Sequence, residues 1–188
     1  QIQPSTPVFA EDGHIDESLL RFRSYIAKSY QQGNTIIEAI SDLEQENDAP
    51  DSAATAQTLV MLGDWRLWNG RTDAAWEAYG KASTELARAD DAQERVPQLF
   101  DEPVALPAIA GINPLPPSVA PNEAAVTLAF GVSANGKVRD IERLDDNEKD
   151  DSQASRLMRQ LRRTPFRPRI EAGQPVETEK LVKAFNIQ

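Results

Sequence analysis

The chain has 188 residues, of which 40% are hydrophobic and 27% charged, and its formal net charge is −10. Zero cysteines and one histidine, His14, exclude thiol catalysis, disulfides, iron–sulfur clusters and metal sites built from cysteine or several histidines. The length and composition allow a folded core in one large domain or two small ones. We therefore expect a binding protein, not an enzyme, with no cofactor and no metal.

Charge is distributed unevenly along the chain. Residues 1–100 contain 17 acidic and 8 basic residues, residues 101–150 contain 9 and 4, and residues 151–188 contain 4 and 8. Because nucleic-acid-binding domains present a broad basic face, this pattern predicts no nucleic-acid partner. No apolar window is long enough for a transmembrane segment in this chain. The chain begins with Gln1 instead of Met, from which we expect that a signal segment was removed before it and that the protein is exported.

The first hundred residues show apolar positions at helical spacing. One helix is predicted from residue 19 to about residue 30, and Gly33–Asn34 should end it. A second helix is predicted over residues 36–43. A third helix should begin after Asp51–Ser52, which are good N-cap residues, and end at Asn69–Gly70. A fourth should follow Thr72–Asp73 and run to about Leu86.

The third and fourth helices resemble a tetratricopeptide repeat, in which small residues allow two antiparallel helices to approach closely. The matching positions are Leu62, Gly63, Gly70, Ala75, Tyr79 and Ala82. The resemblance implies a concave groove on the first helix of the pair. The candidate groove residues are Gln57, Val60, Asp64, Leu67 and Trp68.

Six prolines lie between Pro103 and Pro121. Proline lacks an amide donor and disfavours helix at the preceding residue, so this stretch predicts an extended connector. We therefore expect a helical-repeat domain over residues 1–100, a proline-rich linker over 101–121 and a second domain over 122–188.

The second domain is predicted to have the order strand, strand, helix, strand. Residues 126–132 alternate apolar and small or polar side chains, as in a half-buried strand, and Asn135–Gly136 predicts a hairpin turn with positive φ at both residues. A second strand should run over 137–144 with a bulge, followed by an acidic loop over 145–151 that lacks the ligand spacing of a calcium-binding loop. A helix should follow, with its apolar face formed by Ala154, Leu157, Met158 and Leu161. A third strand should then run over 176–187.

These elements resemble the C-terminal domain of the TonB family, in motifs that follow one another in the family's order. The motifs are Asn135-Gly136-Lys137-Val138, Asp140-Ile141, Phe166-Arg167-Pro168, Gly173-Gln174-Pro175-Val176 and Phe185. The fold class is therefore expected to be α+β, with tetratricopeptide-like helical hairpins before a small ββαβ domain. The resemblance implies a periplasmic location, a protein partner in the bacterial cell envelope and a role in transport.

Strand addition to the open edge of the predicted sheet is the expected mode of binding, because main-chain hydrogen bonds can then hold an extended partner. The candidate edge residues are Val176, Thr178, Lys180, Val182 and Ala184. The same edge would also permit a homodimer.

Two alternatives remain open. The helical groove could hold a peptide or helix, the second domain then being structural. A basic helix face could instead hold an anionic partner. The candidate residues of this face are Arg156, Arg159, Arg162 and Arg163.

Overall fold

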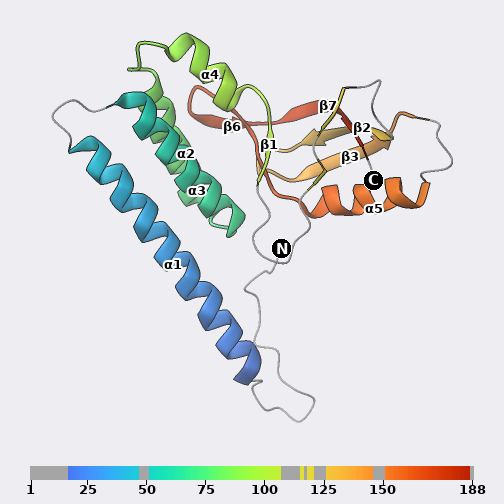
Figure 1. The fold of residues 1–188 in the computed structure, drawn as a ribbon, viewed down its shortest axis with the longest axis horizontal. Helices are drawn as coiled ribbons and strands as arrows, with labels where there is room; N and C mark the ends of the chain where they lie inside the picture. Colours follow the sequence, from blue (N-terminus) through green and yellow to red (C-terminus); the bar gives the residue numbers. More distant parts are fainter. Residues whose placement is uncertain are drawn as a thin grey trace. The chain divides into compact units, whose positions relative to one another are not determined.

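The computed structural model describes residues 17–46, 51–106, 115–116, 118–120, 126–145 and 151–186, with side chains from residue 24 onward. The chain separates into two compact units, Gln1–Glu85 and Leu86–Gln188 (Figure 1). The described residues form helices in the first unit and both helices and antiparallel strands in the second, which confirms the α+β class. None of the described helices combines the length and the apolar character that a membrane span requires.

The division between the units lies before the predicted boundary at residue 100. Helix α4 (Ala92–Phe100) contacts strand β5 (Arg169–Glu171), and strand β1 (Val104–Ala105) pairs with strand β4 (Phe166–Arg167). The described start of the predicted linker is therefore part of the second unit. Residues 107–114, 117 and 121 of that linker lie outside the described residues.

Helix α1 (Glu17–Gln45) is continuous, so the prediction that Gly33–Asn34 ends a helix is wrong. Gly33 is needed for close packing instead of a turn. A Cβ atom at this position would lie 2.5 Å from Cζ2 of Trp65 on helix α2 (Ser52–Trp68). Helix α1 ends at Gln45, close to the predicted end of the second helix at residue 43, and residues 47–50 lie outside the described residues.

Helices α2 and α3 (Thr72–Leu86) follow the predicted bounds. The Asp51 side chain caps α2 by accepting hydrogen bonds from the amides of Ala53 and Ala54, which otherwise have no partner within the helix. The predicted close approach at Gly63 is confirmed, because a Cβ atom there would lie 2.3 Å from Cε1 of the buried Tyr79 on α3.

The second unit contains a three-stranded antiparallel sheet in the order β3-β2-β7. Its strands are β2 (Val126–Val132), β3 (Val138–Arg143) and β7 (Thr178–Phe185), and helix α5 (Asp151–Arg163) follows β3 in the chain. The core is formed by side chains of β2, of α5 and of the end of β7. Its buried members are Val126, Leu128, Phe130, Val132, Ala154, Leu157, Leu161, Phe166 and Phe185.

The predicted last strand over 176–187 is wrong as a single element. Residues Gln174–Val176 form β6, which pairs with β5 in a separate hairpin, and β7 begins only at Thr178. The hairpin turns at Ala172 and Gly173, where φ is 49° and 77°. Both residues thus adopt the left-handed conformation that a tight two-residue hairpin requires. The last residue of the predicted strand, residue 187, lies outside the described residues.

The turn between β2 and β3 also differs from the prediction. Among the described residues of this turn only Gly136 has a positive φ, of 70°, and Asn135 does not. The Ser133 amide donates to the Lys137 carbonyl at 2.9 Å, which closes a three-residue loop with glycine at its left-handed position. The predicted bulge in β3 is confirmed: the register shifts opposite β2 between Ala129 and Gly131, and Asp140 has a φ of 51°.

The described ends of the acidic run are held by an arginine. Arg143 at the end of β3 forms ion pairs with Asp145 at 2.6 Å and with Asp151, the first residue of α5, at 2.5 Å. The hydrogen bond with Asp145, followed by that with Asp151, raises the pKa of the Arg143 guanidinium above its ordinary value. Residues 146–150 of the predicted loop lie outside the described residues.

Candidate partner-binding edge

Strand β7 lies at one edge of the three-stranded sheet, with β2 on its inner side. Its outer side receives one described backbone hydrogen bond: the amide of Val119 donates to the carbonyl of Ala184 at 2.9 Å. Ser118 forms the adjoining bridge with Phe185. An extended segment of the chain itself therefore already pairs with the last residues of this edge.

The same hydrogen bond defines which backbone groups of β7 face outward. Successive residues of a strand direct their amide and carbonyl groups to opposite edges. Ala184 faces outward, so Lys183 faces β2 and Val182 again faces outward. The Leu144 amide donates to the Thr127 carbonyl at 2.9 Å. Thr127, which is the register partner of Ala184, thus directs its own backbone groups toward β3 and away from β7, in agreement with this assignment.

Between Thr178 and Lys183 the structure describes no hydrogen bond to the outer side of β7. The side chain of Val182 is 54% exposed, and that of Lys180 is also exposed. Lys183 forms an ion pair with Glu102 at 2.9 Å. The edge thus combines backbone groups that have no partner among the described residues with one exposed apolar side chain and with lysines, which discourage indiscriminate pairing.

The other predicted edge residues are placed differently. Val176 belongs to β6 and pairs with Arg169, so it does not extend the edge of β7. Thr178 pairs with Val132 near a register shift of β7. This shift lies opposite Gly131, where a Cβ atom would be 2.8 Å from the Glu179 carbonyl oxygen. Of the predicted set, Val182 and Ala184 therefore lie on the regular outer part of β7, and Lys180 lies in the bulge opposite Gly131.

The predicted groove residues do not line an open groove. Val60 and Leu67 are buried in the helical core, and the Asp64 carboxylate accepts a hydrogen bond from the Tyr79 hydroxyl at 2.8 Å. The Trp68 ring stacks on Trp65 with a centroid separation of 6.4 Å. Gln57 alone of the set is fully on the surface.

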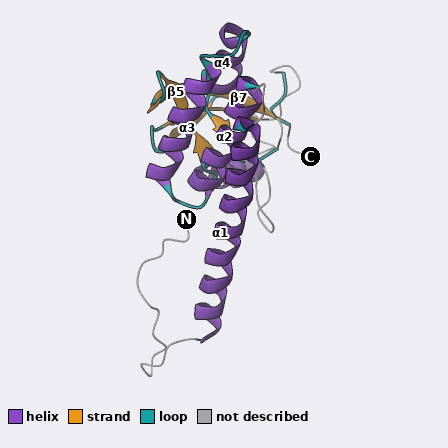
Figure 2. Ribbon diagram, turned by 90° about the vertical axis from the view of Figure 1, so that its left-hand side faces the viewer, coloured by secondary structure: helices purple, strands orange, loops and turns teal. Residues whose placement is uncertain are grey.

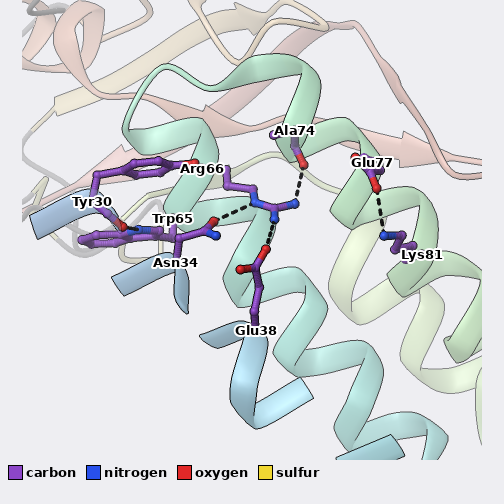
Figure 3. Close-up of polar contacts among 8 residues, drawn as sticks. All are labelled: Tyr30, Asn34, Glu38, Trp65, Arg66, Ala74, Glu77 and Lys81. Atoms are coloured by element: carbon purple, nitrogen blue, oxygen red, sulfur yellow. Dashed lines mark hydrogen bonds and ion pairs between the residues drawn. The ribbon is translucent and has the colours of Figure 1, made fainter. Parts of the chain in front are cut away.

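Figure 3 shows the polar cluster that joins the three helices of the first unit. The largely buried Arg66 donates to Asn34 at 3.0 Å, to Glu38 at 2.6 Å and to the Ala74 carbonyl at 3.0 Å. The Trp65 indole donates to the Tyr30 carbonyl at 3.2 Å. Each of these contacts joins helices to one another, so the cluster has a structural role. The Lys81 ion pair at its margin lowers the pKa of the Glu77 carboxyl.

The basic face of α5 is present as predicted. Arg156, Arg159, Arg162 and Arg163 are exposed, whereas Ala154, Leu157 and Leu161 are buried on the opposite side of the helix. Within the described part of the chain none of the four arginines has an ion-pair partner.

The described residues contain no group of acidic or histidine side chains arranged to hold a metal ion. The pairing of Ser118–Val119 with β7 was not predicted from the sequence, because two residues between prolines show no strand periodicity. The Arg66 cluster was not predicted either. The available signal was that Asn34 and Glu38 lie one helical turn apart, so that both can face an arginine on a neighbouring helix.

Comparison with protein-family models, with curated proteins and with solved structures finds no match for this chain.

Proposed function

We propose that this chain is a non-catalytic protein-binding module that takes up an extended segment of a partner as an added strand on β7. The observation that carries the proposal is the hydrogen bond from Val119 to Ala184, because it is a strand addition already made by the chain itself. The neighbouring outward groups of Val182 offer the next hydrogen bonds in the same ladder. An added strand would pair there, between Ala184 and the bulge at Glu179 and Lys180.

The resemblance to the TonB family supports an envelope location for this binding. The order β2, β3, α5, β7 is compatible with the ββαβ arrangement expected from the sequence motifs. We propose on that basis that the protein is periplasmic and that its partner is another protein of the cell envelope. The helical unit, whose groove positions are largely occupied by its own packing, then serves as a scaffold.

The test uses peptides selected against the whole chain from a displayed library of random ten-residue sequences. Val182→Pro removes the outward amide and should abolish peptide binding measured by fluorescence anisotropy. Val182→Ala removes only the exposed side chain and should retain most of the affinity. Val119→Pro removes the donor that occupies Ala184 and should increase the affinity, since the edge is then longer.

Circular dichroism of each variant checks that the sheet is intact. Lys183→Pro is the matched control for disruption, because its amide faces β2 and its loss should unfold the sheet. Equal binding by Val182→Pro and the unaltered chain, with loss of binding on reversing Arg159 and Arg162, would disprove strand addition and place the site on the basic face of α5.

A further inference from the structure

Helix α1 carries an apolar stripe that the described part of the chain leaves open. Its members are Tyr25, Ile36, Ile40 and Leu43, with exposed fractions of 72%, 61%, 43% and 65%. At about 100° per residue, all four lie within an arc of about 60° on one side of the helix. Single exposed apolar residues are ordinary, whereas an aligned set of four marks an interaction surface. We call this set the α1 stripe.

The α1 stripe is distinct from the face that packs on α2. That face contains Tyr30, Gly33 and Asn34, which contact Trp65 or Arg66, and the buried Ser41. The two faces are centred about 100° apart around the helix. A helix with two such faces is typically packed between two neighbours, and the described residues provide one of them, α2.

The length of α1 also leaves room for a second neighbour. Tyr30 and Gly33 lie against Trp65, close to the last residue of α2, so the part of α1 before Tyr30 extends past the end of α2. Figure 2 shows this part of α1 extending beyond both α2 and α3. Tyr25 lies on this extension, and the α1 stripe therefore continues where no helix of the first unit covers it.

Charge along α1 indicates which neighbour fits. The half up to residue 28 is basic and the half from residue 38 is acidic. The residues are Glu17, Arg21, Arg23 and Lys28 in the first half, and Glu38, Asp42 and Glu44 in the second. Lys28 and Asp42 are exposed and have no ion-pair partner among the described residues. An antiparallel copy of the same helix would bring each basic half beside an acidic half.

We propose that the α1 stripe pairs with the α1 stripe of a second copy of this chain, the two helices running antiparallel across a twofold axis. Such a contact is self-complementary: Tyr25 of each copy meets Leu43 of the other. In this register Lys28 lies level with Ile40 of the second copy and within one turn of its Asp42. A parallel pair would instead place basic beside basic and acidic beside acidic.

Because the chain contains no cysteine, the register can be tested by crosslinking of the full chain. The double variant Tyr25→Cys/Leu43→Cys should form a covalent dimer on mild oxidation. Neither single variant should, since the two copies of either position would lie about 27 Å apart along the helix axis. Crosslinking by the single variants would indicate a parallel pair and overturn the proposal.

Analytical ultracentrifugation tests whether the stripe drives association. The unaltered chain should show a reversible dimer at micromolar concentrations, and Ile36→Glu should raise its Kd by at least about 30-fold, as expected for a central anchor. Ala27→Glu is the matched control, because Ala27 is exposed on the opposite side of α1 and its change should leave the Kd unaltered. A monomer at every concentration would refute the proposal and leave a different protein as the neighbour.

Charge exchange separates self-pairing from other contacts. Lys28→Glu and Asp42→Lys should each weaken the dimer, because each places like charges beside one another across the contact. The double variant should restore the dimer, because each copy then again presents opposite charges to the other, which a different partner protein would not do. A dimer through the β7 edge would survive Ile36→Glu and be lost in Val182→Pro. This outcome would refute the role of α1 without affecting the proposed strand addition.

Discussion

Gly33 provides the sharpest test of the packing in the helical unit. As an ordinary residue inside an exposed helix, its replacement by alanine should stabilise the protein by about 1 kcal/mol, the difference in helix propensity. In this structure the new methyl group would instead lie 2.5 Å from Cζ2 and 2.7 Å from Cε2 of Trp65. The sign of the effect therefore distinguishes an ordinary helical glycine from one required for close packing.

The expected magnitude follows from three contributions. Overpacking of this kind costs about 1–3 kcal/mol. Displacement of the indole also breaks the hydrogen bond from Trp65 to the Tyr30 carbonyl, which contributes about 1 kcal/mol. The propensity gain offsets about 1 kcal/mol of this sum. We therefore expect Gly33→Ala to lower the free energy of unfolding by about 1–3 kcal/mol.

Denaturant unfolding followed by tryptophan fluorescence measures this change in the correct part of the chain, because all three tryptophans lie in the unit Gln1–Glu85. The control is Trp65→Phe, whose smaller ring lacks the atoms that approach Gly33. In that background Gly33→Ala should become neutral or stabilising by up to about 1 kcal/mol. A stabilising effect of Gly33→Ala in the unaltered chain would contradict the packing of α1 on α2 through this residue.

Two further glycine substitutions test the other close approaches. Gly63→Leu should lower the free energy of unfolding by about 1–3 kcal/mol in the same fluorescence assay, because the side chain would overlap the buried Tyr79 ring, whereas the surface change Asp73→Ala should cost far less. Gly131→Ala should destabilise the second unit by a similar amount of about 1–3 kcal/mol, since the obstacle is the backbone of Glu179 and not a side chain that can rotate. Thermal unfolding of the Gly131→Ala variant, followed by the circular dichroism signal of the β-strands, should show a lower Tm for the second unit.

Local signals in the sequence predicted the elements whose causes are local. Asp51 can cap α2 in any context, and the alternation over residues 126–132 predicts a strand. The expectation of one buried face is wrong, because every residue of β2 except Thr127 is buried. Helix α5 was predictable because its apolar and basic residues separate at helical spacing. The last strand was also predicted, as far as residues 178–184 are concerned.

The predictions that failed are those in which a distant residue decides the local conformation. Nothing near Gly33 in the sequence indicates that Trp65 will lie over it. Ala172 adopts a positive φ although alanine rarely does, because the pairing of β5 with β6 closes the turn around it. Those strands have three residues each, too few to show an alternating pattern, and β6 contains Pro175.

Gly131 connects these failures to the proposed function. The ladders on both sides of β2 shift register next to each other: β7 bulges opposite Gly131, and β3 bulges opposite the preceding residue, Phe130. A bulge twists an edge strand and interrupts its ladder, which limits pairing with other strands. The bulge bounds the open part of β7 at one end, and Val119 covers Ala184 at the other. The remaining open stretch around Val182 is short, so a partner strand gains many hydrogen bonds only by displacing Ser118–Val119. An edge of this design favours a specific partner over indiscriminate sheet growth.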